Sequence, residues 1–191
     1  MGLFLYNEYM IYLIGVQILF ALIILVLLLY VAYVLWTFRR IVPYVPTPYS
    51  VINKMIKAAG LKKGEKVIDL GCGTGRIVYQ VASQHLGLVI GLEKFPLLLA
   101  VAKARYLVSL KRAKVKFVKG DMFSFNLEPF EVVFCFLTSQ GMKLLEPSFQ
   151  KLKPGSRLVS YMFALKDHSN FNQRIIEFGK KDRIFVYTKV N

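Results

Sequence analysis

Charged residues are absent from a long stretch near the start of the chain. The thirty residues from Tyr9 to Phe38 contain no Asp, Glu, Lys or Arg, although 19% of the whole chain is charged. The hydrophobic residues, which make up 55% of the chain, are concentrated here. Since a run of about 20 apolar residues suffices to cross a bilayer, the sequence predicts a transmembrane anchor over residues 1–38.

The length and the ends of this stretch agree with a membrane span. Thirty helical residues rise about 45 Å, against about 30 Å for the hydrocarbon core of a bilayer. Aromatic rings that favour the headgroup region lie near both ends, at Tyr6, Tyr9, Tyr12, Tyr30, Tyr33 and Trp36. A cleaved signal peptide and a buried core helix are the alternatives. A signal peptide would need an early basic region, whereas the first basic residue is Arg39.

Lys and Arg are absent before residue 39. Residues 39–191 hold all 26 basic side chains against ten of the 11 acidic ones, a net charge of +16. Because basic residues are retained on the inner side of a membrane, this asymmetry predicts a single-pass protein with its N-terminus outside. The C-terminal domain is then expected on the cytoplasmic or matrix face, close to an anionic leaflet. A nucleic-acid partner is less favoured, because the lysines are scattered and form no stripe with exposed aromatic residues.

Cysteine is scarce. Cys72 and Cys135 are the only two cysteines, and both fall at the ends of expected strands. Their spacing is not that of metal ligands, so we expect neither a disulfide framework nor a metal site. A reducing compartment agrees with this composition.

Three prolines separate the apolar stretch from the rest of the chain. They lie in Arg39-Arg-Ile-Val-Pro-Tyr-Val-Pro-Thr-Pro48, where they prevent helix continuation and favour an extended backbone. Residues 39–49 are therefore expected to be a linker, and residues 50–191 the main domain. A short helix capped by Ser50 is expected over residues 51–59, with Gly60 ending it.

Beyond residue 66, short apolar runs alternate with helical stretches. Strands are expected at residues 67–70, 88–92, 115–118, 132–136 and 158–163, and helices at about 76–84, 96–110 and 144–152. This alternation predicts an α/β fold with a mostly parallel, Rossmann-like sheet and right-handed crossovers. The last segments, 174–178 and 184–190, are expected to add an antiparallel hairpin.

A glycine-rich loop joins the first strand to the following helix in Val67-Ile-Asp-Leu-Gly-Cys-Gly-Thr-Gly-Arg76. Alternate glycines let the backbone turn tightly and let a ligand approach it, beside the N–H groups of the helix N-terminus. A dinucleotide site needs glycine at the sixth position, which here is Arg76, so that fingerprint fails. The spacing and the preceding acid, Asp69, suit the amino-acid moiety of S-adenosylmethionine (SAM). An ordinary strand-to-helix turn is the alternative.

Acidic residues end the next two strands. Glu93 is placed to accept hydrogen bonds from both ribose hydroxyls, although it can also be a surface glutamate. Asp121 is placed to contact the adenine amino group, with Met122 or Phe123 over the ring, although it can also be a turn residue. Ligands bind at the carboxyl ends of parallel strands. The predicted SAM site comprises Asp69, Gly71, Cys72, Gly73, Gly75, Glu93, Asp121 and Met122.

With these motifs the chain resembles the class I SAM-dependent methyltransferases. More narrowly it is similar to a family of small membrane-anchored methyltransferases, which includes the mitochondrial protein-lysine methyltransferases acting on the ATP synthase c-subunit and on the adenine nucleotide translocase, with prokaryotic relatives. The similar stretches are Pro43-Tyr-Val-Pro-Thr-Pro48, Asp69 to Val78, Gly91-Leu-Glu93 and Leu152-Lys-Pro-Gly-Ser-Arg-Leu-Val-Ser160.

The resemblance implies a protein lysine as the methyl acceptor, and Tyr44 and Thr47 as residues that fold over the cofactor. Two departures bear on it. The family has Asp where this chain has Thr74, and an aromatic-rich end after the fifth strand where this chain has Leu165-Lys-Asp-His168. The first leaves SAM binding in place, because this position varies among class I enzymes, whereas the second bears on the acceptor.

The loop after the fourth strand is expected to face the acceptor. Thr138, Ser139 and Gln140, together with Tyr44, are the candidates for orienting it, and a polar loop that closes a strand is the alternative. A SAM-dependent methyltransferase of a membrane-proximal protein lysine is the favoured function. Methylation of a lipid or quinone-like small molecule, and a non-catalytic SAM-binding scaffold, are the alternatives.

Overall fold

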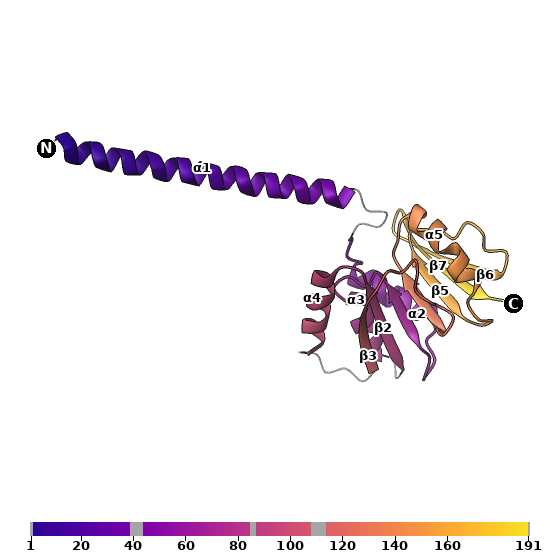
Figure 1. Cartoon of the computed structure of the whole chain (residues 1–191). Helices are drawn as coiled ribbons and strands as arrows, with labels where there is room; N and C mark the ends of the chain where they lie inside the picture. The colour runs from indigo at the N-terminus through magenta and orange to yellow at the C-terminus, as the bar shows by residue number, and fades with distance from the viewer. Residues whose placement is uncertain (1, 39–43, 85–86, 108–113, 191) are drawn as a thin grey trace. The chain divides into compact units, whose positions relative to one another are not determined.

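The computed structural model describes residues 2–38, 44–84, 87–107 and 114–190 (Figure 1). Its internal contacts divide the chain into two compact units, Met1–Pro43 and Tyr44–Asn191. The structure therefore describes only part of the expected linker over residues 39–49. Residues 39–43 lie outside the described residues, and the rest belong to the second unit.

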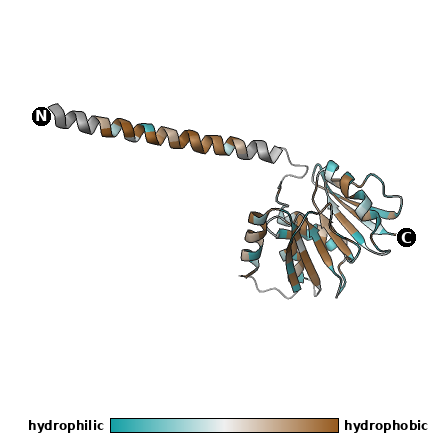
Figure 2. Ribbon diagram, in the orientation of Figure 1, coloured by the Kyte–Doolittle hydropathy of each residue, from teal (hydrophilic) through white to brown (hydrophobic). Residues whose placement is uncertain are grey.

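The first unit consists of helix α1, Gly2–Phe38. Side chains from Met10 to Ala32 are exposed, and Figure 2 shows the hydrophobic colour along this stretch. Within the described part of the chain, α1 alone is long and apolar enough to cross a membrane by length and composition. The aromatic residues expected at the two ends lie partly outside the described side chains, and Tyr12 and Tyr30 are exposed.

The second unit is built on a seven-stranded sheet with the order β3-β2-β1-β4-β5-β7-β6. The strands are β1 Val67–Leu70, β2 Leu88–Glu93, β3 Lys114–Lys119, β4 Val132–Cys135, β5 Arg157–Tyr161, β6 Phe171–Phe178 and β7 Asp182–Lys189. The first five run parallel, and β7 is antiparallel to both of its neighbours. The predicted α/β sheet with an antiparallel C-terminal hairpin is confirmed.

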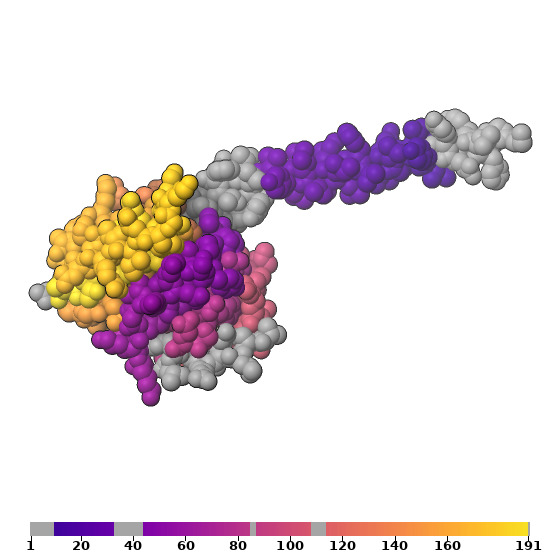
Figure 3. Space-filling model, turned by 180° about the vertical axis from the view of Figure 1, so that it is seen from behind, coloured from indigo at the N-terminus to yellow at the C-terminus, as the bar shows by residue number. Residues whose placement is uncertain are grey.

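Helices cover both faces of this sheet. They are α2 Tyr49–Ala59, α3 Arg76–Gln84, α4 Pro96–Leu107 and α5 Ser139–Gln150. The β1-α3-β2 and β2-α4-β3 crossovers run toward one edge and β4-α5-β5 toward the other, so right-handed connections place α5 on the opposite face from α3 and α4. Helix α2 packs against α3, β5 and β7, and Figure 3 shows its purple surface beside the yellow C-terminal strands.

The core explains why the central strands are so apolar. Every residue of β1 and β4 is buried, as expected for strands covered on both faces. On the side of α2 and α3, Met55 and Val78 pack in one cluster with Phe134 of β4. Each side chain of this size stabilises the fold by about 1.5–3 kcal/mol when it is fully buried.

The parallel strands end together at one edge. Leu70, the last residue of β1, pairs with Leu92 of β2 and with Cys135 of β4. The residues that follow these three strands are therefore neighbours in space. The glycine loop, Phe136 and Glu93, the last residue of β2, therefore lie at this edge, although they are far apart in the sequence.

Several predicted boundaries are wrong. Ser50 does not cap α2: the helix begins at Tyr49, and its cap residue Pro48 offers its carbonyl to the N–H groups of Val51 and Ile52. The fifth strand ends at Tyr161, because Met162 adopts a positive φ of 68°. The end of the second predicted helix, residues 108–110, lies outside the described residues.

The predicted helix over 144–152 begins five residues earlier, at Ser139. Ser139 and Gln140 are therefore helical and not part of a loop. The Thr138 side chain caps the helix by accepting a hydrogen bond from Gly141 N at 3.1 Å. Pro147 lies inside the helix.

Candidate active site

The glycine loop after β1 has the conformation that its three glycines permit. Gly71, Gly73 and Gly75 have φ of 69°, 54° and 80°, a region that other residues rarely adopt. The Gly75 N–H donates to the Cys72 carbonyl at 2.8 Å, and the Tyr79 N–H donates to the Gly75 carbonyl at 2.9 Å. The loop thus closes a tight turn and leads directly into α3.

Glu93 ties this loop to the end of β2. Its Oε2 accepts a hydrogen bond from Gly73 N at 2.9 Å, and its Oε1 accepts one from Phe95 N at 2.9 Å. The side chain is 5% exposed. Each carboxylate oxygen has a second lone pair, so Glu93 can hold the loop and still accept hydrogen bonds from a ligand.

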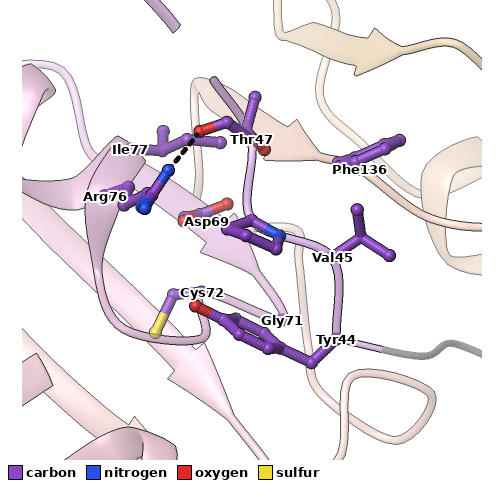
Figure 4. A pocket seen from close by; sticks show the side chains of 10 residues that line it. Tyr44, Val45, Thr47, Asp69, Gly71, Cys72, Arg76, Ile77 and Phe136 are labelled. Carbon is purple, nitrogen blue, oxygen red and sulfur yellow. Dashed lines mark hydrogen bonds between the residues drawn. The ribbon is translucent and has the colours of Figure 1, made fainter. Parts of the chain in front are cut away.

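Asp69 lies beneath the loop and lines a pocket together with Gly71 and Cys72 (Figure 4). It is 4% exposed, and burial raises the pKa of its carboxyl well above the ordinary range, helped by the negative charge of Glu93. A cation in this pocket would favour the ionised form of Asp69. Arg76 lines the same pocket, so the pocket presents one acidic and one basic side chain to a ligand.

Cys72 contributes its backbone more than its thiol. Its N–H donates to the Leu92 carbonyl at 2.9 Å, which fixes the loop on β2. Burial raises the pKa of the Cys72 thiol, so the residue is not a nucleophile. Its sulfur would also lie 2.9 Å from a Cβ atom at Gly91, which explains why glycine occupies that position.

Asp121 and Met122 follow β3 at the same edge. Lys94 Nζ lies 2.7 Å from Oδ2 of Asp121, and the Phe123 N–H donates to Oδ1 at 3.1 Å. The hydrogen bond from Lys94 lowers the pKa of the Asp121 carboxyl. Met122 reaches the glycine loop, where its Cε would lie 3.4 Å from a Cβ at Gly71. All the predicted cofactor residues therefore gather at one edge of the sheet.

Tyr44 and Thr47, in the segment that enters the domain, close the pocket from the other side (Figure 4). The Tyr44 ring lies against Gly73, where any Cβ atom would collide with it. Thr47 is 6% exposed, and its carbonyl accepts a hydrogen bond from Arg76 Nη1 at 3.2 Å. Tyr44 therefore lies at the cofactor end of the site.

The sequence prediction missed two arginines that brace this segment. The hydroxyls of Tyr44 and Thr74 share a hydrogen bond of 3.1 Å, and Arg105 Nη1 of α4 donates to Thr74 Oγ1 at 3.4 Å. Arg105 Nη2 also donates to the Tyr49 hydroxyl at 3.0 Å, and the Arg76 guanidinium lies over the Tyr49 ring. Position 105 lies far from the glycine motif in the sequence, which offered no signal for it.

Ser139 and Gln140 line a separate groove with Lys143, Phe163, Lys166 and Arg183. Three of these residues are basic, and Arg183 pairs with Glu177 at 2.9 Å. Phe136 joins the two cavities: it lines the pocket beside Asp69, and its ring stacks against that of Phe163 with centroids 6.5 Å apart. Within the described residues, no group of His, Cys, Asp and Glu is arranged to hold a metal ion.

Comparisons with known proteins match both the fold and the site. A model of the ANTKMT methyltransferase domain matches residues 69–171. The chain is 34% identical over 127 residues to a protein-lysine N-methyltransferase of Saccharolobus islandicus, covering 65% of this chain and 79% of the relative. It is 27% identical over 159 residues to the ATP synthase c-subunit lysine N-methyltransferase of Caenorhabditis elegans, covering 79% of this chain and 83% of the relative.

A solved structure agrees with these relatives. The RNA methyltransferase of Salinibacter ruber in complex with S-adenosyl-L-homocysteine superposes with a TM-score of 0.69 and 28% sequence identity. The similarity covers 76% of this chain and 94% of that one. It therefore extends over nearly the whole of a methyltransferase that binds the product form of SAM.

Proposed function

Since this chain belongs to the ANTKMT methyltransferase domain family, we propose that it methylates lysine side chains of membrane-proximal proteins while α1 anchors it in the bilayer. The chain is a SAM-dependent methyltransferase, as its family and its similarity to the enzyme bound to S-adenosyl-L-homocysteine show. The acceptor, the anchor and the roles of individual residues are the proposal.

We assign the residues of the site to the parts of SAM as follows. Glu93 is assigned to the ribose hydroxyls, because its side chain contacts the glycine loop through Oε2 and each of its oxygens keeps a second lone pair. Asp69 is assigned to the cationic amino-acid end, Gly71, Cys72, Gly73 and Gly75 to the backbone cradle, and Asp121 with Met122 to the adenine. The observation that most supports a SAM site is the Glu93 carboxylate, which is buried and accepts a hydrogen bond from Gly73 of this cradle.

When bound, SAM supplies a methyl group on a positively charged sulfur, which passes to the acceptor nitrogen. The protein's own residues position the acceptor and exclude water, and good positioning can supply about 7–11 kcal/mol of the barrier. A lysine ammonium, with a reference pKa of about 10.4, must first lose a proton so that its lone pair can attack. We assign the orientation of the neutral amine to Tyr44, which lines the pocket with Phe136, and to Ser139 and Gln140, which line the groove. Thr138, immediately before them, is included in the assignment.

The relatives favour a protein acceptor. Two of them, from Saccharolobus islandicus and Caenorhabditis elegans, are named for lysine methylation of proteins. The groove beside Ser139 and Gln140 is open and has an apolar floor that includes Phe163 and Phe185. Such a surface can receive a polypeptide segment whose lysine reaches toward Phe136.

The apolar helix α1 and the distribution of charge support the proposed anchor. The apolar span Met10–Ala32 meets the length and composition of a transmembrane helix, and every Lys and Arg lies after it. We propose an anchor over residues 1–38, a linker at 39–49, and a catalytic domain over 50–191 on the cytoplasmic or matrix face. The active site would then remain close to the membrane and meet acceptors there far more often than in bulk solution.

Tritium transfer tests this function. Membranes that contain the full chain are incubated with methyl-tritiated SAM, and the label is measured separately in protein, lipid and nucleic acid. We expect label in protein, and none with Gly73→Arg, whose side chain cannot fit against Tyr44. Label in lipid would instead support the small-molecule alternative, and label in RNA would favour the substrate class of the Salinibacter ruber enzyme. Failure of the full chain to bind SAM would remove every catalytic function considered for it.

A further inference from the structure

Helix α4 carries an apolar stripe that faces away from its own domain. Its inner face, Leu99 and Ala102, is buried against β2 and β3. Its outer face exposes Leu97 by 77%, Val101 by 40% and Leu107 by 85%. Ala100 and Ala104 lie between them and are also exposed. These five residues, which we call the α4 stripe, repeat at helical spacing and form one continuous line along the helix.

A stripe of this kind is unusual on a soluble surface. Scattered apolar residues are common there, whereas contiguous apolar surface marks contact with a partner or a membrane. The outer face of a helix packed on a sheet is normally polar. The ribbon of α4 in Figure 2 is brown over much of its length.

The charges around the stripe are positive. Helix α4 contains Lys103 and Arg105 and no acidic residue. Lys94, just before it, is paired with Asp121 but is 61% exposed. An apolar stripe bordered by Lys and Arg is the pattern of helices that lie in the headgroup region of anionic bilayers.

The residue at which the chain enters the catalytic domain, Tyr44, is linked to the same helix. Tyr44 is the first residue of the domain, and its hydroxyl bonds to Thr74, which accepts a hydrogen bond from Arg105 of α4. Only residues 39–43 separate Tyr44 from Phe38, the last residue of α1. Such a segment spans at most about 20 Å, so a membrane-inserted α1 would hold this part of the domain close to the lipid surface.

We propose that the α4 stripe docks on the anionic inner surface of the membrane. Leu97, Val101 and Leu107 enter the boundary between headgroups and acyl chains, while Lys103 meets lipid phosphates. The domain is thereby held in one orientation, with the Tyr44 side of its active site toward the bilayer. This inference rests on the proposed membrane anchor.

Site-directed fluorescence tests the docking in the full chain. The protein is reconstituted into phosphatidylcholine vesicles with and without phosphatidylglycerol, and a polarity-sensitive dye is attached to Leu97→Cys. The matched control is Lys153→Cys, an exposed position in the turn before β5, at the opposite edge of the sheet from the active site. Cys72 and Cys135 are buried free thiols and compete poorly for the dye. Nitroxide lipids report contact with the bilayer, and aqueous iodide reports exposure to water.

The expected result is strong quenching at position 97 by nitroxide lipids, increased by phosphatidylglycerol, and quenching at position 153 by iodide alone. Paired Leu97→Asp and Val101→Asp substitutions should abolish the contact and lower methyl transfer to membrane acceptors severalfold, while SAM affinity stays unchanged. Equal iodide quenching at both positions in a chain that floats with the vesicles would overturn the docking and leave the anchor intact. If the dye is instead buried without lipid, and more so at higher protein concentration, the docking is overturned and the α4 stripe is assigned to contact with a second copy of the chain. Failure to float would contradict the anchor itself.

Discussion

The backbone N–H of Gly73 donates a 2.9 Å hydrogen bond to the Glu93 carboxylate, across 20 positions of sequence. The residue assigned to the ribose therefore also holds the loop assigned to the amino-acid end of the cofactor. The two parts of the SAM site are coupled before any ligand binds. A change at Glu93 is expected to alter both.

Glu93→Gln is expected to weaken SAM binding by about tenfold to a hundredfold. The amide has one acceptor oxygen, so its NH2 group must face either the Gly73 or the Phe95 N–H, which leaves that donor unpaired at a cost of about 1–3 kcal/mol. Calorimetric titration and thermal unfolding measure both effects. Lys153→Gln is the control for an exposed change. Unchanged affinity with Glu93→Gln would remove Glu93 from the cofactor site.

SAM affinity is expected to rise with pH between the pKa of Asp69 in the complex and its raised pKa in the free protein. Burial raises the pKa of this carboxyl in the free protein, and a bound cation would lower it again, so binding releases a proton between the two values. The affinity therefore increases as pH rises through that window, by at most about tenfold per pH unit. Titrations in buffers of different ionisation enthalpy measure the released proton. Asp69→Asn should abolish the release, and an unchanged proton count would assign it to another group.

The raised pKa of Asp69 also predicts that the free energy of unfolding falls as pH rises, whereas SAM affinity increases. Because the folded pKa of Asp69 is raised, its contribution to stability is largest below the ordinary value and declines as pH rises through the raised value. Asp69→Asn removes this decline. The variant is expected to unfold at the same or a higher temperature than the parent at neutral pH, while it binds SAM more weakly. A large loss of stability would show that Asp69 supports the fold and not the ligand.

Tyr44 and Thr74 are expected to act as a pair. Tyr44→Phe and Thr74→Val each remove one hydroxyl of the 3.1 Å hydrogen bond, and each should weaken SAM binding by about 0.5–1 kcal/mol. The double variant should lose little more than either single one, which a double-mutant cycle measures. Additive losses would deny the coupling. Tighter binding after Tyr44→Ala would show that the ring occupies the place of the cofactor.

Substitutions of Thr138 and Gln140 are expected to have different effects: the first should lower stability, and the second should lower the rate of methyl transfer. Thr138 caps α5 through Gly141 N, so Thr138→Val should cost about 1 kcal/mol of stability and lower Tm by about 2–4 °C. Gln140 is exposed in the first turn of α5, so Gln140→Ala should leave Tm unchanged and lower kcat. Equal activity of Gln140→Ala and the parent would remove Gln140 from the acceptor site.

Periodic and local patterns predicted most of the fold. The apolar runs at β1 and β4 and the glycines at 71, 73 and 75 act through short-range rules, so both the strands and the loop between them could be read directly. Boundaries failed where tertiary contacts decide them. Capping by Thr138 and packing of Met142 and Leu145 start α5 at Ser139, five residues before the predicted start.

The residues of the candidate site likewise include some that could be predicted from the sequence and some that could not. Asp69, Glu93 and Asp121 could be placed together because parallel strands end at one edge of a sheet. Arg105 could not, because its hydrogen bonds to Thr74 and Tyr49 depend on how α4 lies against the entering segment. The contact between Phe136 and Phe163, which joins the pocket to the groove, also depends on tertiary packing and could not be predicted from sequence spacing.

The most direct test of the central claim is the chemical form in which the methyl group is recovered. Membrane proteins labelled by the full chain with methyl-tritiated SAM are hydrolysed, and their amino acids are separated. We expect tritium in Nε-methylated lysine with the parent chain, and a loss of about tenfold or more with Glu93→Ala at a limiting SAM concentration. Tritium in any other amino acid, or undiminished methyl-lysine with Glu93→Ala, would contradict it.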